Sequence, residues 1–186
     1  MIVSPLADSS PHFSLAQDYP QVMREQLKDR LPRFTEADFA LLREADLDFY
    51  GMNYYTSQFA RCRRHISDAP ETDFHGNVDE YKEDKSGKRI GEPSGIDWLH
   101  SAPKGFHKHL VRIYAKYRKP IYVTENGCPC PGEDKMGREE SVHDEYRQRY
   151  FSDHLDAVTK AAQDGVEVKG YFAWSLLDNL GKCTAW

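Results

Sequence analysis

Residues 120–127, which read Pro-Ile-Tyr-Val-Thr-Glu-Asn-Gly, constrain the fold of this chain more than any other segment. Residues that favour strands run into a single carboxylate, Glu125, and the Asn-Gly pair that follows predicts the end of the strand. The pattern places Glu125 at the carboxyl end of a strand, with its backbone held by a sheet and its side chain facing a loop. In parallel α/β barrels, carboxylates at this end of a strand carry the chemistry.

The neighbouring segments predict an alternation of strands and helices. Residues 47–56 are rich in aromatic residues and have no helical period, which favours a strand. The apolar positions of 101–117 predict an amphipathic helix, and those of 146–162 predict a longer one. Residues 166–174 predict the last strand. Strands joined by helices are parallel neighbours, so the sequence predicts an α/β fold.

Two shorter helices and one long loop complete the prediction. Pro20 and Pro32 bracket the first helix, and Thr35 is placed to cap the second. Residues 57–100 are long, polar and interrupted by glycine and proline. Such a segment inside a domain is typical of a functional lid or of a part without regular structure.

Composition excludes several classes of function. The chain has 186 residues and a formal net charge of −5, so we expect no nucleic-acid partner and no attachment to anionic membranes. We find no apolar run near the ~20 residues of a membrane span and no signal peptide in residues 1–11. With four cysteines, too few for a disulfide scaffold, we expect a cytoplasmic protein.

The predicted strand ends bring four kinds of side chain to one face of the fold. They are the amide of Asn53, the phenol of Tyr55, the carboxylate of Glu125 and the indole of Trp174. An indole can stack on a sugar ring, an amide can bond a hydroxyl, and a carboxylate can face the anomeric carbon. The phenol can donate a hydrogen bond to the carboxylate. Each residue alone is an ordinary strand-end residue, but together they favour a sugar site.

Three segments closely resemble glycoside hydrolase family 1, and most nearly its fungal β-glucosidases. They are 49–56 (Phe-Tyr-Gly-Met-Asn-Tyr-Tyr-Thr), 122–127 (Tyr-Val-Thr-Glu-Asn-Gly) and 170–179 (Gly-Tyr-Phe-Ala-Trp-Ser-Leu-Leu-Asp-Asn). The resemblance implies that residues 19–180 are the C-terminal part of a (β/α)8 TIM barrel, with about three barrel strands and the barrel incomplete. Residues 1–18 are then an irregular, non-homologous N-terminus, and 181–186 an aberrant tail.

The same resemblance implies a role for each site residue. Glu125 would be the catalytic nucleophile of a retaining glycosidase, and Tyr55 would orient it by a hydrogen bond. Asn53 would line the sugar site, and Trp174 would form the platform beneath the sugar. The substrate would be a small β-glucoside or an oligosaccharide such as cellobiose, from which terminal glucose is released in carbohydrate catabolism. The family needs no cofactor and no metal.

The chain departs from the family pattern at the second carboxylate. A retaining enzyme needs a second acid about 5 Å from the nucleophile, and the family places it in an Asn-Glu-Pro motif that this sequence lacks. We therefore expect this chain alone to be inactive. The alternative function is a sugar-binding or non-functional truncated product. Oligomeric state and sugar specificity are open at this point.

Two other sites are weaker alternatives. Cys128 and Cys130 could hold a metal with nearby histidines, but Cys-Pro-Cys is not a zinc-knuckle spacing. His107 and His109 lie two apart on a predicted helix and so point to different faces. The basic cluster at 61–65 could contact phosphate, although a solvated loop fits an acidic chain better.

Overall fold

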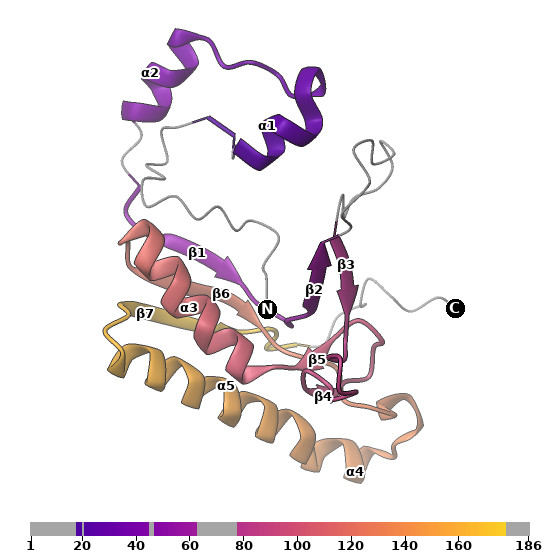
Figure 1. The fold of residues 1–186 in the computed structure, drawn as a ribbon. Helices are drawn as coiled ribbons and strands as arrows, with labels where there is room; N and C mark the ends of the chain where they lie inside the picture. Colours follow the sequence, from indigo (N-terminus) through magenta and orange to yellow (C-terminus); the bar gives the residue numbers. More distant parts are fainter. Residues whose placement is uncertain (1–17, 20, 45–46, 63–77, 178–186) are drawn as a thin grey trace.

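The computed structural model describes residues 18–19, 21–44, 47–62 and 78–177, and its centre is a parallel sheet with the strand order β1-β6-β7. Helices separate these strands along the chain, so strand and helix alternate as predicted (Figure 1). The elements are β1 (Tyr50–Asn53), α3 (Pro103–Tyr117), β6 (Ile121–Asn126), α5 (Glu145–Gln163) and β7 (Val168–Ala173). The α/β class is confirmed.

The carboxyl ends of the three strands meet at one edge of the sheet. β6 is central and pairs in parallel with both neighbours. Asn53 at the end of β1 is opposite Glu125, and Ala173 at the end of β7 is opposite Asn126. The strand ends that carry the predicted site residues are therefore neighbours in space.

One face of the sheet is covered by α3 and α5, which also pack on each other. Phe106 and Leu110 of α3 and Ile121 and Val123 of β6 are fully buried there. The rest of this core consists of Met52, Tyr54, Ala157, Ala161 and Val166. Successive side chains of β1 point to opposite faces of the sheet, and apolar residues recur on one side of each helix. Both patterns place these side chains in the same layer.

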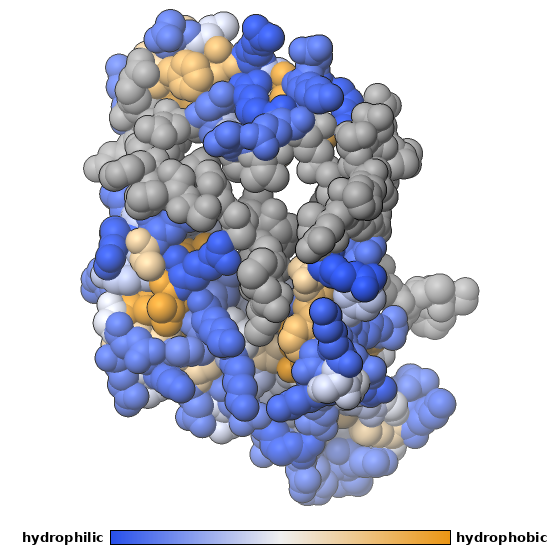
Figure 2. Space-filling view, in the orientation of Figure 1, coloured by the Kyte–Doolittle hydropathy of each residue, from blue (hydrophilic) through white to orange (hydrophobic). Residues whose placement is uncertain are grey.

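The opposite face of the sheet is open. Phe49 and Phe172 are 50% and 57% exposed, and Phe49 contacts the ring of Tyr122 edge to face at 4.9 Å. On the side of the molecule seen in Figure 2, the coloured residues are mostly hydrophilic, with hydrophobic residues in separate patches. Within the described ranges the sheet has three strands and does not close into a barrel.

Local sequence signals account for the ends of both covering helices. Pro103 occupies the first turn of α3, and Arg118 ends it in the left-handed conformation with its N–H donating to the Tyr114 carbonyl. Asp144 caps α5, its carboxylate accepting from the Arg147 N–H at 3.2 Å. Gly165 follows α5 with a φ of 89°, which favours glycine.

The N-terminal helices α1 (Gln21–Leu27) and α2 (Glu36–Glu44) are close to the prediction. Pro32 does not end the first helix directly, because a 3-10 turn at Lys28–Arg30 follows Leu27. Thr35 does cap α2: its Oγ1 accepts from the Asp38 N–H at 3.3 Å, and the Asp38 carboxylate accepts from the Thr35 N–H at 2.8 Å. No helix in the described part of the chain is long and apolar enough to span a membrane.

The prediction of an irregular 57–100 segment is wrong in part. Two small antiparallel pairs form within it: β2 (Phe59–Cys62) with β3 (Val78–Tyr81), and β4 (Glu92–Pro93) with β5 (His100–Ser101). These strands have two or four residues each, too short to produce a visible alternation in the sequence. Residues 63–77 lie outside the described residues, as do Pro20, the predicted tail at 181–186 and all of the predicted N-terminal segment 1–18 except Asp18.

Candidate active site

The centre of the site is a contact between Tyr55 and Glu125 at the carboxyl ends of β1 and β6. The Tyr55 hydroxyl donates to Glu125 Oε2 at 2.5 Å. Between these strand ends, the Tyr54 N–H donates to the Glu125 carbonyl at 2.9 Å, so the backbones are joined as well. Two predicted site residues, 70 positions apart in the sequence, are therefore in direct contact.

The environment of this pair keeps the phenol protonated. Burial raises the pKa of Tyr55 above its usual range, and the hydrogen bond and negative charge of Glu125 raise it further. The phenol therefore keeps its proton and is the donor in this hydrogen bond. A hydrogen bond of this kind stabilises the charged form of an acid and restricts its rotamer.

Asn53 and Trp174 lie on either side of β6 at the same end of the sheet. Asn53 accepts a hydrogen bond from the Thr124 hydroxyl at 2.6 Å, and its amide is exposed. Trp174 follows the last residue of β7, and its N–H donates to the Asn126 carbonyl at 2.8 Å. The indole is 46% exposed. All four predicted residues thus border the same edge of the sheet.

Gly127 allows β6 and β7 to approach each other beside Glu125. A Cβ on Gly127 would lie 1.9 Å from the carbonyl oxygen of Trp174. The clash would be with backbone, so no rotation of a side chain could relieve it. The close approach that keeps Trp174 next to the end of β6 therefore requires glycine at this position.

We predict that Gly127→Ala separates the ends of β6 and β7. The free energy of unfolding should fall by at least about 1–3 kcal/mol, the usual cost of overpacking, as measured by urea denaturation. Gly137→Ala is the matched control, because a Cβ there has open space around it and should change stability by no more than about 0.5 kcal/mol. Equal free energies of unfolding for Gly127→Ala and Gly137→Ala would contradict the close approach of β6 and β7 at Gly127.

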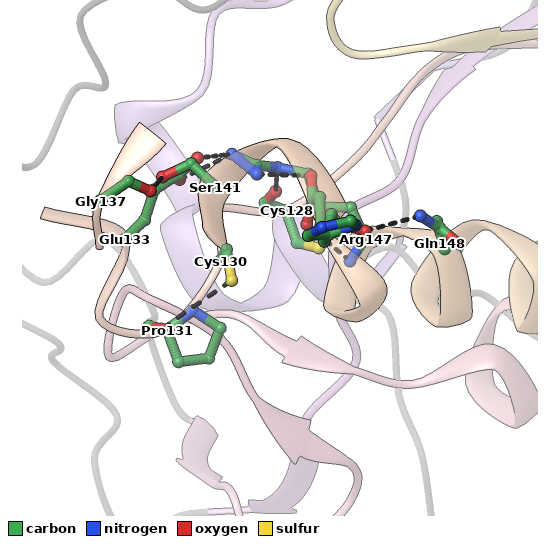
Figure 3. A network of polar contacts seen from close by, with 10 residues as sticks. Cys128, Cys130, Pro131, Glu133, Gly137, Ser141, Arg147 and Gln148 are labelled. Carbon is green, nitrogen blue, oxygen red and sulfur yellow. Dashed lines mark hydrogen bonds and ion pairs between the residues drawn. The ribbon is translucent and has the colours of Figure 1, made fainter. Parts of the chain in front are cut away.

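The loop after β6 is held in place by Arg147 of α5 (Figure 3). Its guanidinium donates to the carbonyl of Cys128 at 3.2 Å and to both carboxylate oxygens of Glu133 at 2.5 and 2.6 Å. It also pairs with Asp144 at 2.7 Å. The chain that leaves the Glu125 strand is thereby fixed to the start of α5.

Of the two weaker alternatives, the metal site receives no further support from the described residues, whereas residues 63–65 of the basic cluster lie outside them. Burial raises the pKa of the Cys128 thiol to about 12. His107 lies 2.7 Å from Asp164, whereas His109 packs against Tyr54, so the two rings face different neighbours. Among the described residues, no group of three or more His, Cys, Asp or Glu side chains could hold a metal ion.

Trp98 lies beside Tyr55 and was not among the site residues predicted from sequence. Its ring contacts the ring of Tyr55 edge to face at 6.2 Å, and it is 41% exposed. Trp98 lies in the long 57–100 segment, whose path could not be derived from sequence pattern. A tryptophan in a polar segment was the available signal, because tryptophan is enriched at interfaces.

Comparisons with known proteins agree on one family. The family model for glycosyl hydrolase family 1 matches residues 10–186. β-Glucosidase 1B of Phanerodontia chrysosporium is 40% identical over 87% of this chain and 29% of its own length. β-Glucosidase 42 of Arabidopsis thaliana is 39% identical over 87% of this chain and 33% of its own length. The chain therefore spans about a third of the length of these relatives.

Solved structures give the same result. A family 1 β-glucosidase from the fungus Humicola insolens, in complex with glucose, matches with a TM-score of 0.81 and 42% identity. β-Glucosidase 2 from Trichoderma reesei, in complex with Tris, matches with a TM-score of 0.79 and 44% identity. Each match covers 87% of this chain, and 34% and 35% of the respective solved chains.

Proposed function

Because the chain belongs to glycosyl hydrolase family 1, we propose that it is the C-terminal part of a retaining β-glucosidase barrel and carries the nucleophile, Glu125. The relatives it matches are named β-glucosidases, which supports a terminal β-linked glucose as the substrate group. The chain matches only about a third of their length. Turnover by the whole protein would therefore depend on residues outside this sequence.

The hydrogen bond between Tyr55 and Glu125 is the observation that supports this proposal most. A nucleophilic carboxylate must be ionised and must hold one rotamer so that an oxygen faces the anomeric carbon. Tyr55 serves the second requirement, because its 2.5 Å contact with Oε2 holds the carboxylate in one rotamer. This contact leaves the other oxygen of Glu125 for the attack.

The proposed reaction proceeds in two displacements. A Glu125 oxygen bonds to the anomeric carbon while the glycosidic bond breaks, and the leaving oxygen takes the electron pair and a proton from a second acid. Water then attacks the anomeric carbon of the glycosyl ester and gives a proton to the second acid, now deprotonated, which frees Glu125 and releases glucose. Asn53 would bond a sugar hydroxyl, and the indoles of Trp174 and Trp98 would supply apolar surface for sugar rings.

A second candidate function is sugar binding without turnover. It is favoured by one observation, the absence of an Asn-Glu-Pro motif from the sequence. Acid–base help contributes about 10²–10⁴-fold to a rate, so we expect little or no cleavage of alkyl glucosides or cellobiose by this chain. Cleavage of a glucoside whose leaving group needs no proton is not limited in this way.

Turnover assays with two substrates distinguish the two functions. With 2,4-dinitrophenyl β-glucoside we expect one equivalent of dinitrophenol to be released as a burst, because Glu125 can be glycosylated without acid help. Methyl β-glucoside should not be cleaved. Binding of glucose without any burst would favour the second candidate and count against Glu125 as the nucleophile.

We predict that Tyr55→Phe slows glycosylation of Glu125. The ring is kept, but the carboxylate loses a charge-assisted hydrogen bond worth about 1.5–3 kcal/mol, which corresponds to a decrease of roughly 10–100-fold in rate. The burst rate with 2,4-dinitrophenyl β-glucoside measures this decrease in the rate of glycosylation.

The matched control is Tyr114→Phe, which removes a hydroxyl from a partly buried tyrosine of α3 that packs against the core. Its burst rate should equal that of the unmodified chain. A Tyr55→Phe rate that is also unchanged would show that Tyr55 does not orient the nucleophile.

A further inference from the structure

The buried side-chain amide of Asn126, whose nitrogen and oxygen both have hydrogen-bond partners, lies behind the Tyr55–Glu125 pair. Asn126 is 0% exposed, and its Nδ2 donates to the carbonyl of Tyr54 at 2.7 Å and to the hydroxyl of Tyr150 at 2.9 Å. Its Oδ1 accepts from the hydroxyl of Tyr171. One side chain next to Glu125 thus joins β6, β7, α5 and the residue that follows β1. In folded proteins, the donors and acceptors of buried amides are normally paired in this way.

Tyr150 connects this amide to the other half of the pair. Its hydroxyl accepts from Asn126 and donates to the carbonyl of Tyr55 at 3.3 Å. The ring belongs to α5 and is 2% exposed. One hydroxyl therefore contacts both Tyr55 and the residue that follows Glu125, at the point where the two strand ends must stay in register.

His154 fixes the ring of Tyr150. The two rings stack with centroids 4.0 Å apart, and Nδ1–H donates to the Tyr150 carbonyl at 2.7 Å. Burial lowers the pKa of His154, so the ring is neutral. Its Nε2 has no hydrogen-bond partner within the described part of the chain. The imidazole thus acts as a packing surface that leaves Tyr150 little freedom to rotate.

We propose that Tyr150 is a positioning residue, whose hydroxyl sets the relative placement of Glu125 and Tyr55 without touching the sugar. The inference rests on the proposed role of Glu125. Loss of this hydroxyl would leave the Tyr55 carbonyl without this donor and would remove one acceptor from the buried amide of Asn126. Small displacements of reacting groups reduce rates strongly, so the effect should appear at Glu125.

The variant Tyr150→Phe tests the proposal, because it keeps the ring that stacks on His154 and removes only the hydroxyl. We expect 2,4-dinitrophenyl 2-deoxy-2-fluoro-β-glucoside to modify this variant about fivefold more slowly, the factor that corresponds to one hydrogen bond of ordinary net strength. The final stoichiometry and the half-saturating reagent concentration should be unchanged. A lower stoichiometry at an unchanged rate would mean partial misfolding and would overturn the proposal.

Tyr146→Phe is the matched control. Tyr146 lies one turn earlier on α5, and its hydroxyl donates to the carbonyl of Pro93 at 2.8 Å, away from Asn126. Its modification rate should stay within about twofold of the unmodified chain, a change well below that of one net hydrogen bond. Equal slowing by both variants would show a general effect of losing a hydroxyl from α5 and would also overturn the proposal.

Hydrogen exchange provides a readout that does not depend on chemistry at Glu125. The Tyr54 and Trp174 amides donate to the carbonyls of Glu125 and Asn126, and the Tyr50 amide donates to the carbonyl of Pro120 at the opposite end of β1. Tyr150→Phe should accelerate exchange at the first two amides and leave Tyr50 unchanged. Uniform acceleration, or none, would overturn the proposal. If the unmodified chain takes up no fluorosugar, the proposed function fails, and exchange still decides the role of Tyr150.

Discussion

Glu125→Gln should abolish the dinitrophenol burst from 2,4-dinitrophenyl β-glucoside. The amide has nearly the shape of the carboxylate and can still meet the Tyr55 hydroxyl, but it carries no charge with which to attack the anomeric carbon. Loss of a covalent nucleophile costs other enzymes on the order of 10⁴-fold or more, so we expect no burst above background. In a longer protein that supplies the second acid, the same change should abolish hydrolysis.

Glu139→Gln provides the control for this experiment. Glu139 is exposed on α4 (Arg138–His143), so the same chemical change is made away from the strand ends. Its burst should equal that of the unmodified chain in size and rate. Substantial activity in Glu125→Gln would mean that another group is the nucleophile, and the assignment of the site would be wrong.

Phe106→Ala should have the largest effect on stability. Phe106 is fully buried between the sheet and both covering helices, and its ring stacks on Tyr54 at 4.5 Å and lies 5.6 Å from His154. Truncating such a side chain typically costs about 3–5 kcal/mol, which is a large share of the roughly 5–15 kcal/mol of a whole domain. Urea denaturation followed by circular dichroism measures the change.

Val142→Ala is the comparison for this variant, because Val142 is 73% exposed on α4. It should change the free energy of unfolding by no more than about 0.5 kcal/mol. Phe106→Ala could instead lower the free energy of unfolding by less than about 1 kcal/mol, which is below the range for buried aromatic residues. That result would contradict the packing of α3 against β1.

The parts of the fold that were predictable from sequence are those with strong local periodicity. The spacing of Phe106 and Leu110 predicted α3, and the run into Glu125 predicted β6, because both elements bury one regular face. β1 and β7 were predicted in the right places, although each is shorter than the pattern suggested. The β2–β3 and β4–β5 pairs depend on partners distant in sequence, so local pattern could not reveal them.

The site was predictable to the same extent. Glu125, Tyr55, Asn53 and Trp174 lie at strand ends, and the rule that parallel strands share an edge brings them together. Trp98 reaches the site from a segment without periodicity. The hydrogen bonds of Asn126 and Tyr150 could not be derived either, because they depend on how α5 packs behind the sheet. From sequence alone, a tyrosine on the apolar side of a helix is interpreted as an ordinary core residue.

The most direct test of the account is to locate the covalent adduct on the unmodified chain. After incubation with 2,4-dinitrophenyl 2-deoxy-2-fluoro-β-glucoside, the chain is digested and the modified peptide is sequenced by mass spectrometry. The account predicts one fluoroglucosyl group per chain, on Glu125. An adduct on a different carboxylate, or none on a folded chain, would contradict the claim that these three strands carry the nucleophile of a retaining glycosidase.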